Sequence, residues 1–172
     1  RIYLEFNGYC NRTCEWCPNS KIKRNGNYED YNMDWDVYIK IVDELSVLFK
    51  NCINRSFMVS FARFNEPLAD IETFKKYGEY LIKNVPKASI AINSNSDYIN
   101  DDINLKELKT AGLGYINAMD YEEKTTQELN REKLIRLGYD EENIENTKVL
   151  KGVKALQSNM PMISLATMWK FF

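Results

Sequence analysis

The stretch IYLEFNGYCNRTCEWC, residues 2–17, joins a strand pattern to a loop that contains three cysteines. Ile2, Leu4 and Phe6 alternate with more polar neighbours, which is the period of a β-strand, and Asn7-Gly8 ends the alternation. The cysteines follow at once, in a CxxxCxxC arrangement. A strand that ends in a cysteine-rich loop is therefore the first element of the expected fold and also the first candidate site.

The rest of the chain continues the alternation of strand and helix patterns. This order predicts an α/β fold with a parallel sheet and right-handed crossovers. In such sheets ligands bind beyond the carboxyl ends of the strands, so the loops after the strands are the places to search. Strand patterns cover residues 2–6, 57–64, 88–93, 115–119 and 162–168, and helix patterns cover residues 35–49, 71–85, 105–111, 125–137 and 148–156.

The composition is that of one domain with a core of its own. The chain has 172 residues, of which 44% are hydrophobic and 13% aromatic, and this is too apolar for a disordered segment. Its formal net charge of −2 supplies no basic footprint for nucleic acid. No apolar run approaches the ~20 residues of a membrane span, and no signal-peptide pattern opens the chain. We therefore expect a cytoplasmic protein with no nucleic-acid partner and no membrane partner.

The chain contains no histidine. This excludes Ser-His-Asp and Cys-His catalysis, histidine-ligated zinc catalysis and imidazole acid–base chemistry. The chain also begins at Arg1, directly before a strand pattern, and ends on the largely aromatic residues 169–172. Because such ends would leave apolar surface uncovered, we expect residues 1–172 to be part of a longer protein.

Cys10, Cys14 and Cys17 are spaced closely enough to bind one metal centre. Disulfide pairing would leave one thiol over, and three bunched thiols are typical of a reduced compartment. A structural zinc site needs four ligands, and Cys52 is the other thiol in the chain. A four-iron cluster can instead be held by three cysteines, with one iron open to a further ligand.

The CxxxCxxC spacing, with Trp16 directly before the third cysteine, resembles the signature of radical S-adenosylmethionine enzymes. The likeness continues at the ends of later strands, and the elements follow the family's order from Ile2 to about Asp120. Phe64-Asn65-Glu66-Pro67 is similar to the family's Gly-Gly-Glu-Pro stretch, and residues 92–97 are similar to its Thr-Asn-Gly element. Ala111-Gly112, together with residues 115–117, is similar to the segment that leads into the family's fourth strand.

One stretch departs from the family's pattern. Phe64 and Asn65 stand where the family has two glycines, whereas Glu66 and Pro67 are retained. Asparagine adopts unusual backbone angles more readily than most residues, so the backbone edge can still serve a ligand. The alternative is that residues 65–67 form only a strand-ending turn.

The resemblance implies a partial (β/α)6 barrel, with about five β/α units present in an incomplete core domain, residues 1–172. It implies an enzyme in which a [4Fe-4S] cluster on Cys10, Cys14 and Cys17 cleaves S-adenosyl-L-methionine to a 5′-deoxyadenosyl radical, which abstracts hydrogen from a substrate. The implied electron donor is a protein such as flavodoxin or ferredoxin. A peptide or protein substrate, modified by an enzyme of the SPASM/twitch type, is the first expectation, and a sugar, nucleoside or other small molecule is the second.

The same resemblance implies a set of cofactor-binding residues. Glu66 and the carbonyl groups of its turn would accept from the cofactor's ammonium group, and Asn117 is a candidate for the ribose hydroxyls. Roles in turns or as polar groups inside the barrel are the alternative. Arg63, directly before the turn, is a candidate for pointing inwards toward a carboxylate. The full set is Trp16, Asn65, Glu66, Pro67, Ser94, Asn95 and Asn117.

A non-catalytic zinc module is the competing hypothesis from another class. It would use all four cysteines to brace a partner-binding domain, and it predicts a colourless protein with one tightly bound zinc ion. The radical enzyme predicts a brown, oxygen-sensitive protein. Cys52 follows a whole predicted helix, so we expect it at the far side of the sheet as a small buried hydrophobe, which disfavours zinc.

Overall fold

The computed structural model describes residues 1–14, 17–21, 32–50, 56–99, 104–120, 132, 134–136, 138 and 140–148. Its strands form one sheet in the order β1-β2-β3-β4-β5, and each neighbouring pair is parallel. Parallel neighbours need a crossover connection, which here contains the helices. The predicted α/β class with a parallel sheet is confirmed. The strands are β1 (Ile2–Tyr3), β2 (Phe57–Ser60), β3 (Ala88–Ser94), β4 (Leu113–Asp120) and β5 (Ile144–Lys148).

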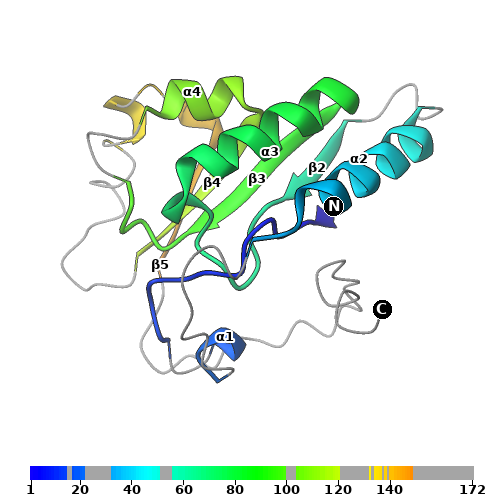
Figure 1. Ribbon diagram of the computed structural model, residues 1–172. Coiled ribbons are helices and arrows are strands. Elements are labelled where there is room, and N and C mark those ends of the chain that lie inside the picture. Colours follow the sequence, from blue (N-terminus) through cyan, green and yellow to red (C-terminus); the bar gives the residue numbers. More distant parts are fainter. Residues whose placement is uncertain are drawn as a thin grey trace.

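Helices α2, α3 and α4 cover one face of the sheet, and α1 lies apart from them next to the loop that follows β1 (Figure 1). The three covering helices begin after Asp34, Asp70 and Asn104, whose side chains accept hydrogen bonds from first-turn N–H groups. Asp34 is the cap that the sequence predicts for the first of them. The helices are α1 (Pro18–Lys21), α2 (Trp35–Phe49), α3 (Ile71–Asn84) and α4 (Leu105–Thr110), with 3₁₀ turns at Pro67–Ala69 and Glu141–Asn143.

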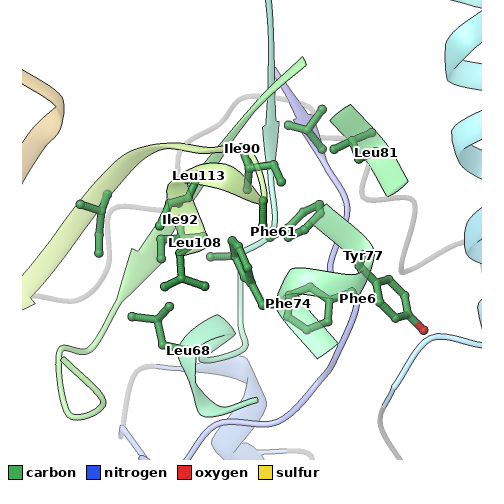
Figure 2. Close-up of a cluster of buried hydrophobic side chains, with 14 of the residues drawn as sticks. Phe6, Phe61, Leu68, Phe74, Tyr77, Leu81, Ile90, Ile92, Leu108 and Leu113 are labelled. Atoms are coloured by element: carbon green, nitrogen blue, oxygen red, sulfur yellow. The ribbon is translucent and has the colours of Figure 1, made fainter. Parts of the chain in front are cut away.

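An aromatic cluster fixes the ends of the first two strands (Figure 2). Phe6 and Phe61 follow β1 and β2 and meet edge to face, with ring centroids 5.3 Å apart. Both rings also pack on Phe74 of α3, at 5.9 and 5.4 Å. Each such pair contributes about 0.5–1.5 kcal/mol beyond burial. The cysteine loop and the turn at residues 63–66 therefore both begin at residues that are packed firmly in the core.

The last strand lies where the sequence does not predict one. β5 covers Ile144–Lys148, whereas the sequence pattern predicts a helix that begins at Lys148. The segment IENTK has a single aliphatic residue, so it gives no strand alternation. The strand predicted over residues 162–168 lies outside the described residues, as do residues 149–156 of the predicted helix. Residues 132 and 134–136 are helical, inside the helix predicted over 125–137.

Gly78 of α3 allows this helix to lie close to the end of α4. A Cβ at this position would lie 2.3 Å from the carbonyl oxygen of Ala111. Alanine normally favours a helix interior by about 1 kcal/mol, but forced overpacking costs about 1–3 kcal/mol. We expect Gly78→Ala to lower the free energy of unfolding in urea by about 2 kcal/mol, because the contact is with backbone and cannot move aside. Glu79→Ala, at an exposed neighbouring position, is the control, and a Gly78→Ala variant as stable as the parent would contradict the packing argument.

Candidate metal and cofactor site

Three free thiols line one cavity at the carboxyl end of the sheet. Cys10, Cys14 and Cys17 lie in the loop after β1, each partly buried, and the Cys17 N–H donates to the Cys14 carbonyl at 3.0 Å. The cavity has a volume of about 240 Å³. Its described lining also includes Arg12 of the cysteine loop and Pro18 of α1. The turn after β2, the end of β3 and β4 supply the other lining residues, which are Arg63, Phe64, Asn65, Glu66, Asn93, Asn95 and Met119.

The three thiols are a donor set that iron–sulfur clusters use. Each cysteine of a four-iron cluster binds a different iron, so three thiols in one cavity can hold such a cluster and leave one iron open to a further ligand. Burial raises the pKa of the Cys10 and Cys14 thiols. Metal binding would therefore release protons, and it should become more favourable as the pH rises. The cavity and its donor set fit an iron–sulfur cluster.

Glu66 is the buried centre of the site, with only 1% of its surface exposed. Its carboxylate accepts hydrogen bonds from the Ser94 hydroxyl at 2.9 Å and from the Asn95 backbone N–H at 2.6 Å. It also accepts from the Leu68 N–H at 3.1 Å, and its own N–H donates to the Tyr9 carbonyl at 2.7 Å. Burial raises the pKa of Glu66 to about 7, although these hydrogen bonds oppose the rise. Glu66 thus joins the turn after β2 to the end of β3.

Asn65 holds the turn by its side chain. Its Nδ2 donates to the Phe61 carbonyl at 2.9 Å and to Asn7 Oδ1 at 3.0 Å, and its Oδ1 accepts from the Arg63 N–H at 3.1 Å. Asn19 of α1 donates to the Phe64 carbonyl at 2.8 Å. The turn that replaces the glycines of the resembled family is therefore stabilised by amide side chains. Pro67 is buried at the start of the following 3₁₀ turn.

Four residues join the cysteine loop to the loop after β3, and we call them the loop clamp: Asn11, Arg12, Asn95 and Asp97. Asp97 Oδ2 accepts from Asn11 Nδ2 at 2.6 Å and from Arg12 Nε at 2.7 Å, and its second oxygen pairs with Arg12 Nη2. Asn95 Nδ2 donates to Asn11 Oδ1 at 2.7 Å and lies 3.9 Å from Cys10 Sγ. The Arg12 hydrogen bonds lower the pKa of Asp97 below its ordinary value. The clamp holds the first cysteine beside the end of β3.

Sequence reasoning missed the clamp. The sequence predicts no role for Asn11, Arg12 or Asp97, although Asp97 belongs to the segment 92–97 that resembles a family element. The opposite charges of Arg12 and Asp97 were the one sequence feature that could have indicated this contact. A local sequence pattern does not show which residues 85 positions apart will meet.

Ser96, in the loop after β3, has a backbone conformation that is usually adopted by glycine. Its φ is 68°, in the left-handed region. Its N–H donates to Ser94 Oγ at 3.0 Å and its hydroxyl to the Met119 carbonyl at 3.2 Å, so the loop ties the end of β3 to β4. On β4, Asn117 pairs in register with Asn93 of β3, and its Oδ1 is buried without a partner among the described residues. Trp16 and Cys52 lie outside the described residues.

Comparisons with known proteins give relatives of one kind. No family model matches the chain. Over 100 residues the chain is 31% identical to the S-adenosyl-L-methionine-dependent 2-deoxy-scyllo-inosamine dehydrogenase of Niallia circulans, an alignment that covers 58% of the chain and 36% of that protein. The crystal structure of BtrN in complex with AdoMet and 2-DOIA matches with a TM-score of 0.66 and 26% identity. An open conformation of selenomethionine BtrN matches with a TM-score of 0.61 and 23% identity.

These likenesses support the fold and correct one expectation. Both structural matches cover 86% of the chain but only 55% of the solved one, so the chain spans about half the length of those relatives. Membership in a peptide-modifying subgroup of the SPASM/twitch type is wrong, because the relative with a named substrate acts on an aminocyclitol. In the described part of the chain, no helix has the length and apolarity needed to cross a membrane.

Proposed function

We propose that this chain is the cluster- and cofactor-binding part of a radical S-adenosylmethionine enzyme. The observation that carries the proposal is that the three CxxxCxxC cysteines, the Glu66 turn and Asn95, just after β3, line the same cavity. These elements come from three different loops, so their assembly is not a consequence of local sequence. The S-adenosyl-L-methionine dependence in the name of the Niallia circulans relative supports the same reading.

The residues of the cavity divide into two proposed roles. Cys10, Cys14 and Cys17 would hold a [4Fe-4S] cluster, which when bound supplies the electron for cleavage of S-adenosylmethionine and so for hydrogen abstraction. Glu66, buried and bonded to Asn95 and Ser94, would fix the edge against which the cofactor's amino-acid end lies. The remaining proposed cofactor contacts are Trp16, Asn65, Pro67 and Asn117. An external electron donor such as flavodoxin or ferredoxin would reduce the cluster.

We propose dehydrogenation of a small polyhydroxylated ring as the reaction. The 5′-deoxyadenosyl radical would take one hydrogen atom from a carbon that bears a hydroxyl group, the hydroxyl proton would pass to a base or to solvent, and the remaining electron would pass to an oxidised iron–sulfur cluster. The support is the aminocyclitol substrate in the name of the curated relative and the 26% identity to the solved BtrN complex. The described cavity wall includes the amide of Asn93, a group that can bind hydroxyl groups.

The test uses the full-length protein, reconstituted anaerobically with iron and sulfide. It is then given dithionite, S-adenosylmethionine and 2-deoxy-scyllo-inosamine that carries deuterium on its ring carbons. We expect a brown protein that forms 5′-deoxyadenosine containing deuterium from the ring. Cys14→Ala should lose the cluster and the product, whereas Cys52→Ala, the matched control, should keep both. Protein that binds zinc as isolated and loses it in both variants would support the structural module instead. 5′-Deoxyadenosine without deuterium would overturn the aminocyclitol substrate alone.

A further inference from the structure

Asn95 is a buried amide between the loop after β3 and the cysteine loop, with 7% of its surface exposed. Its backbone N–H donates to Glu66 Oε2 at 2.6 Å. Its side-chain Oδ1 accepts from the Asp97 N–H at 3.0 Å, and its Nδ2 donates to Asn11 Oδ1 at 2.7 Å. The amide plane of Asn95 is therefore fixed both at its oxygen and at its nitrogen, and it cannot turn without breaking one of these hydrogen bonds.

The fixed amide has a second N–H group, and the sulfur of a cysteine lies next to it. An asparagine side chain carries two N–H groups on one nitrogen, and Asn11 Oδ1 accepts one of them. The same nitrogen lies 3.9 Å from Cys10 Sγ, within hydrogen-bond distance of an acceptor as large as sulfur. The two N–H groups of Asn95 thus have two partners, and one partner is a proposed cluster ligand.

A hydrogen bond to a cysteine sulfur affects how readily an iron–sulfur cluster is reduced. A thiolate bound to iron carries negative charge, so a donor to it makes a charge-assisted hydrogen bond. Reduction adds one electron to the cluster, which makes the sulfur a better acceptor, and the hydrogen bond therefore stabilises the reduced form more than the oxidised form. Hydrogen bonds to the sulfurs are one of the factors that set the potential of such clusters. The burial of Asn95 strengthens the interaction, because the local dielectric is low.

We propose that Asn95 raises the reduction potential of the cluster through its N–H group beside Cys10. This inference rests on the proposed function, because it requires a four-iron cluster on the three cysteines. The external donor supplies the one electron of the reduction, and no covalent bond of the protein forms or breaks. Asn95 acts through the Cys10 sulfur and is thus a positioning residue, whose amide is held in place by Asn11 and Asp97.

The first measurement is the midpoint potential of the cluster, without S-adenosylmethionine, so that no turnover occurs. Full-length protein with the reconstituted cluster is titrated with dithionite, and the reduced cluster is followed by electron paramagnetic resonance. We expect Asn95→Leu to lower the equilibrium constant for one-electron reduction about tenfold, which corresponds to a potential about 59 mV more negative. Asn11→Leu is the matched control, because it breaks the bond between the two amides but leaves the Asn95 oxygen bound to the Asp97 N–H. Its equilibrium constant should stay within about twofold of the parent's.

The second measurement detects the contact itself. Protein is produced with ¹⁵N confined to the side-chain amides of asparagine, and the reduced cluster is examined by pulsed electron paramagnetic resonance for coupling to ¹⁵N. We expect coupling in the parent and in Asn11→Leu, and its loss in Asn95→Leu. A purely structural role of Asn95 in the loop clamp predicts lower iron content in both variants and no such coupling in the parent.

The outcomes separate this proposal from the proposed function. Equal shifts of potential in the two variants would assign the effect to the loop clamp as a whole and overturn the role of the sulfur contact, as would an unchanged potential in Asn95→Leu. A parent with a four-iron cluster but without ¹⁵N coupling would overturn this proposal alone, and that measurement needs no variant to fold. A parent that assembles no four-iron cluster would overturn the proposed function and this proposal with it.

Discussion

The free energy of unfolding of the cluster-free parent protein is expected to fall by about 2.5 kcal/mol between pH 5 and pH 8, relative to that of Glu66→Gln. Burial raises the pKa of this carboxyl group from 4.5 to about 7, despite hydrogen bonds from Asn95, Leu68 and Ser94. An acid whose pKa is higher in the folded than in the unfolded state binds its proton more tightly when folded. Its contribution to stability is therefore complete below pH 4.5 and is lost as the pH rises through 7.

Urea unfolding at several pH values measures the effect. Glutamine keeps the shape of the side chain and does not titrate, so the difference between the two curves isolates the charge at this position. Glu79→Gln, at an exposed position on α3, is the control and should follow the parent at every pH. Superimposable pH profiles for the parent and Glu66→Gln would show that Glu66 is ionised without penalty in the folded protein. A cationic cofactor in the cavity would favour the ionised form, so ligand binding should reduce the difference.

The order of the strands and of the three longer helices up to residue 120 was predictable from local pattern, whereas the single helical turn α1 (Pro18–Lys21) was not. Apolar residues at strand and helix spacing, and a cap such as Asp34, are properties of short segments, and the structure has elements wherever these signals were strong. β5 was not predicted, because its five residues include only one aliphatic side chain and so show no strand alternation. Its place in the sheet depends on pairing with β4, from Ile116 with Ile144 to Asp120 with Lys148, which no local pattern encodes.

The site was predictable where chemistry depends on residue type, and not where it depends on long-range contact. The three cysteines were proposed as ligands from their spacing, and Glu66 was proposed from the resemblance of its turn to the Gly-Gly-Glu-Pro stretch of a known family. The partners of Glu66 lie 28 and 29 residues away and became visible only in the folded chain. The comparisons do not support the expected peptide substrate. The motifs in the sequence belong to the cofactor site, and the side chains that recognise a substrate need not follow the spacing of those motifs.

Breaking the loop clamp by Asp97→Ala is expected to reduce cluster retention about tenfold, which corresponds to ~1.4 kcal/mol. The change removes acceptors from Asn11 and Arg12, so the cysteine loop loses its attachment to the end of β3. The ion pair is partly exposed, with 25% and 31% of the two side chains accessible, and this lowers the expected effect below that of a buried pair. The measurement is the iron content of reconstituted protein after gel filtration, together with the alkylation rate of the cysteines in cluster-free protein.

Two comparisons distinguish positioning from general stability. Asp97→Asn keeps the size of the side chain and one acceptor oxygen, so it should retain more cluster than Asp97→Ala. Glu107→Gln breaks the ion pair with Lys75, whose atoms lie 2.8 Å apart between α3 and α4, and it should leave iron content and alkylation unchanged. If Asp97→Ala lowers the urea midpoint but its cysteines react at the parent's rate, the clamp stabilises the fold without ordering the cysteine loop. Faster alkylation with an unchanged midpoint would show that the clamp acts on the loop itself, because local opening of a loop requires no global unfolding.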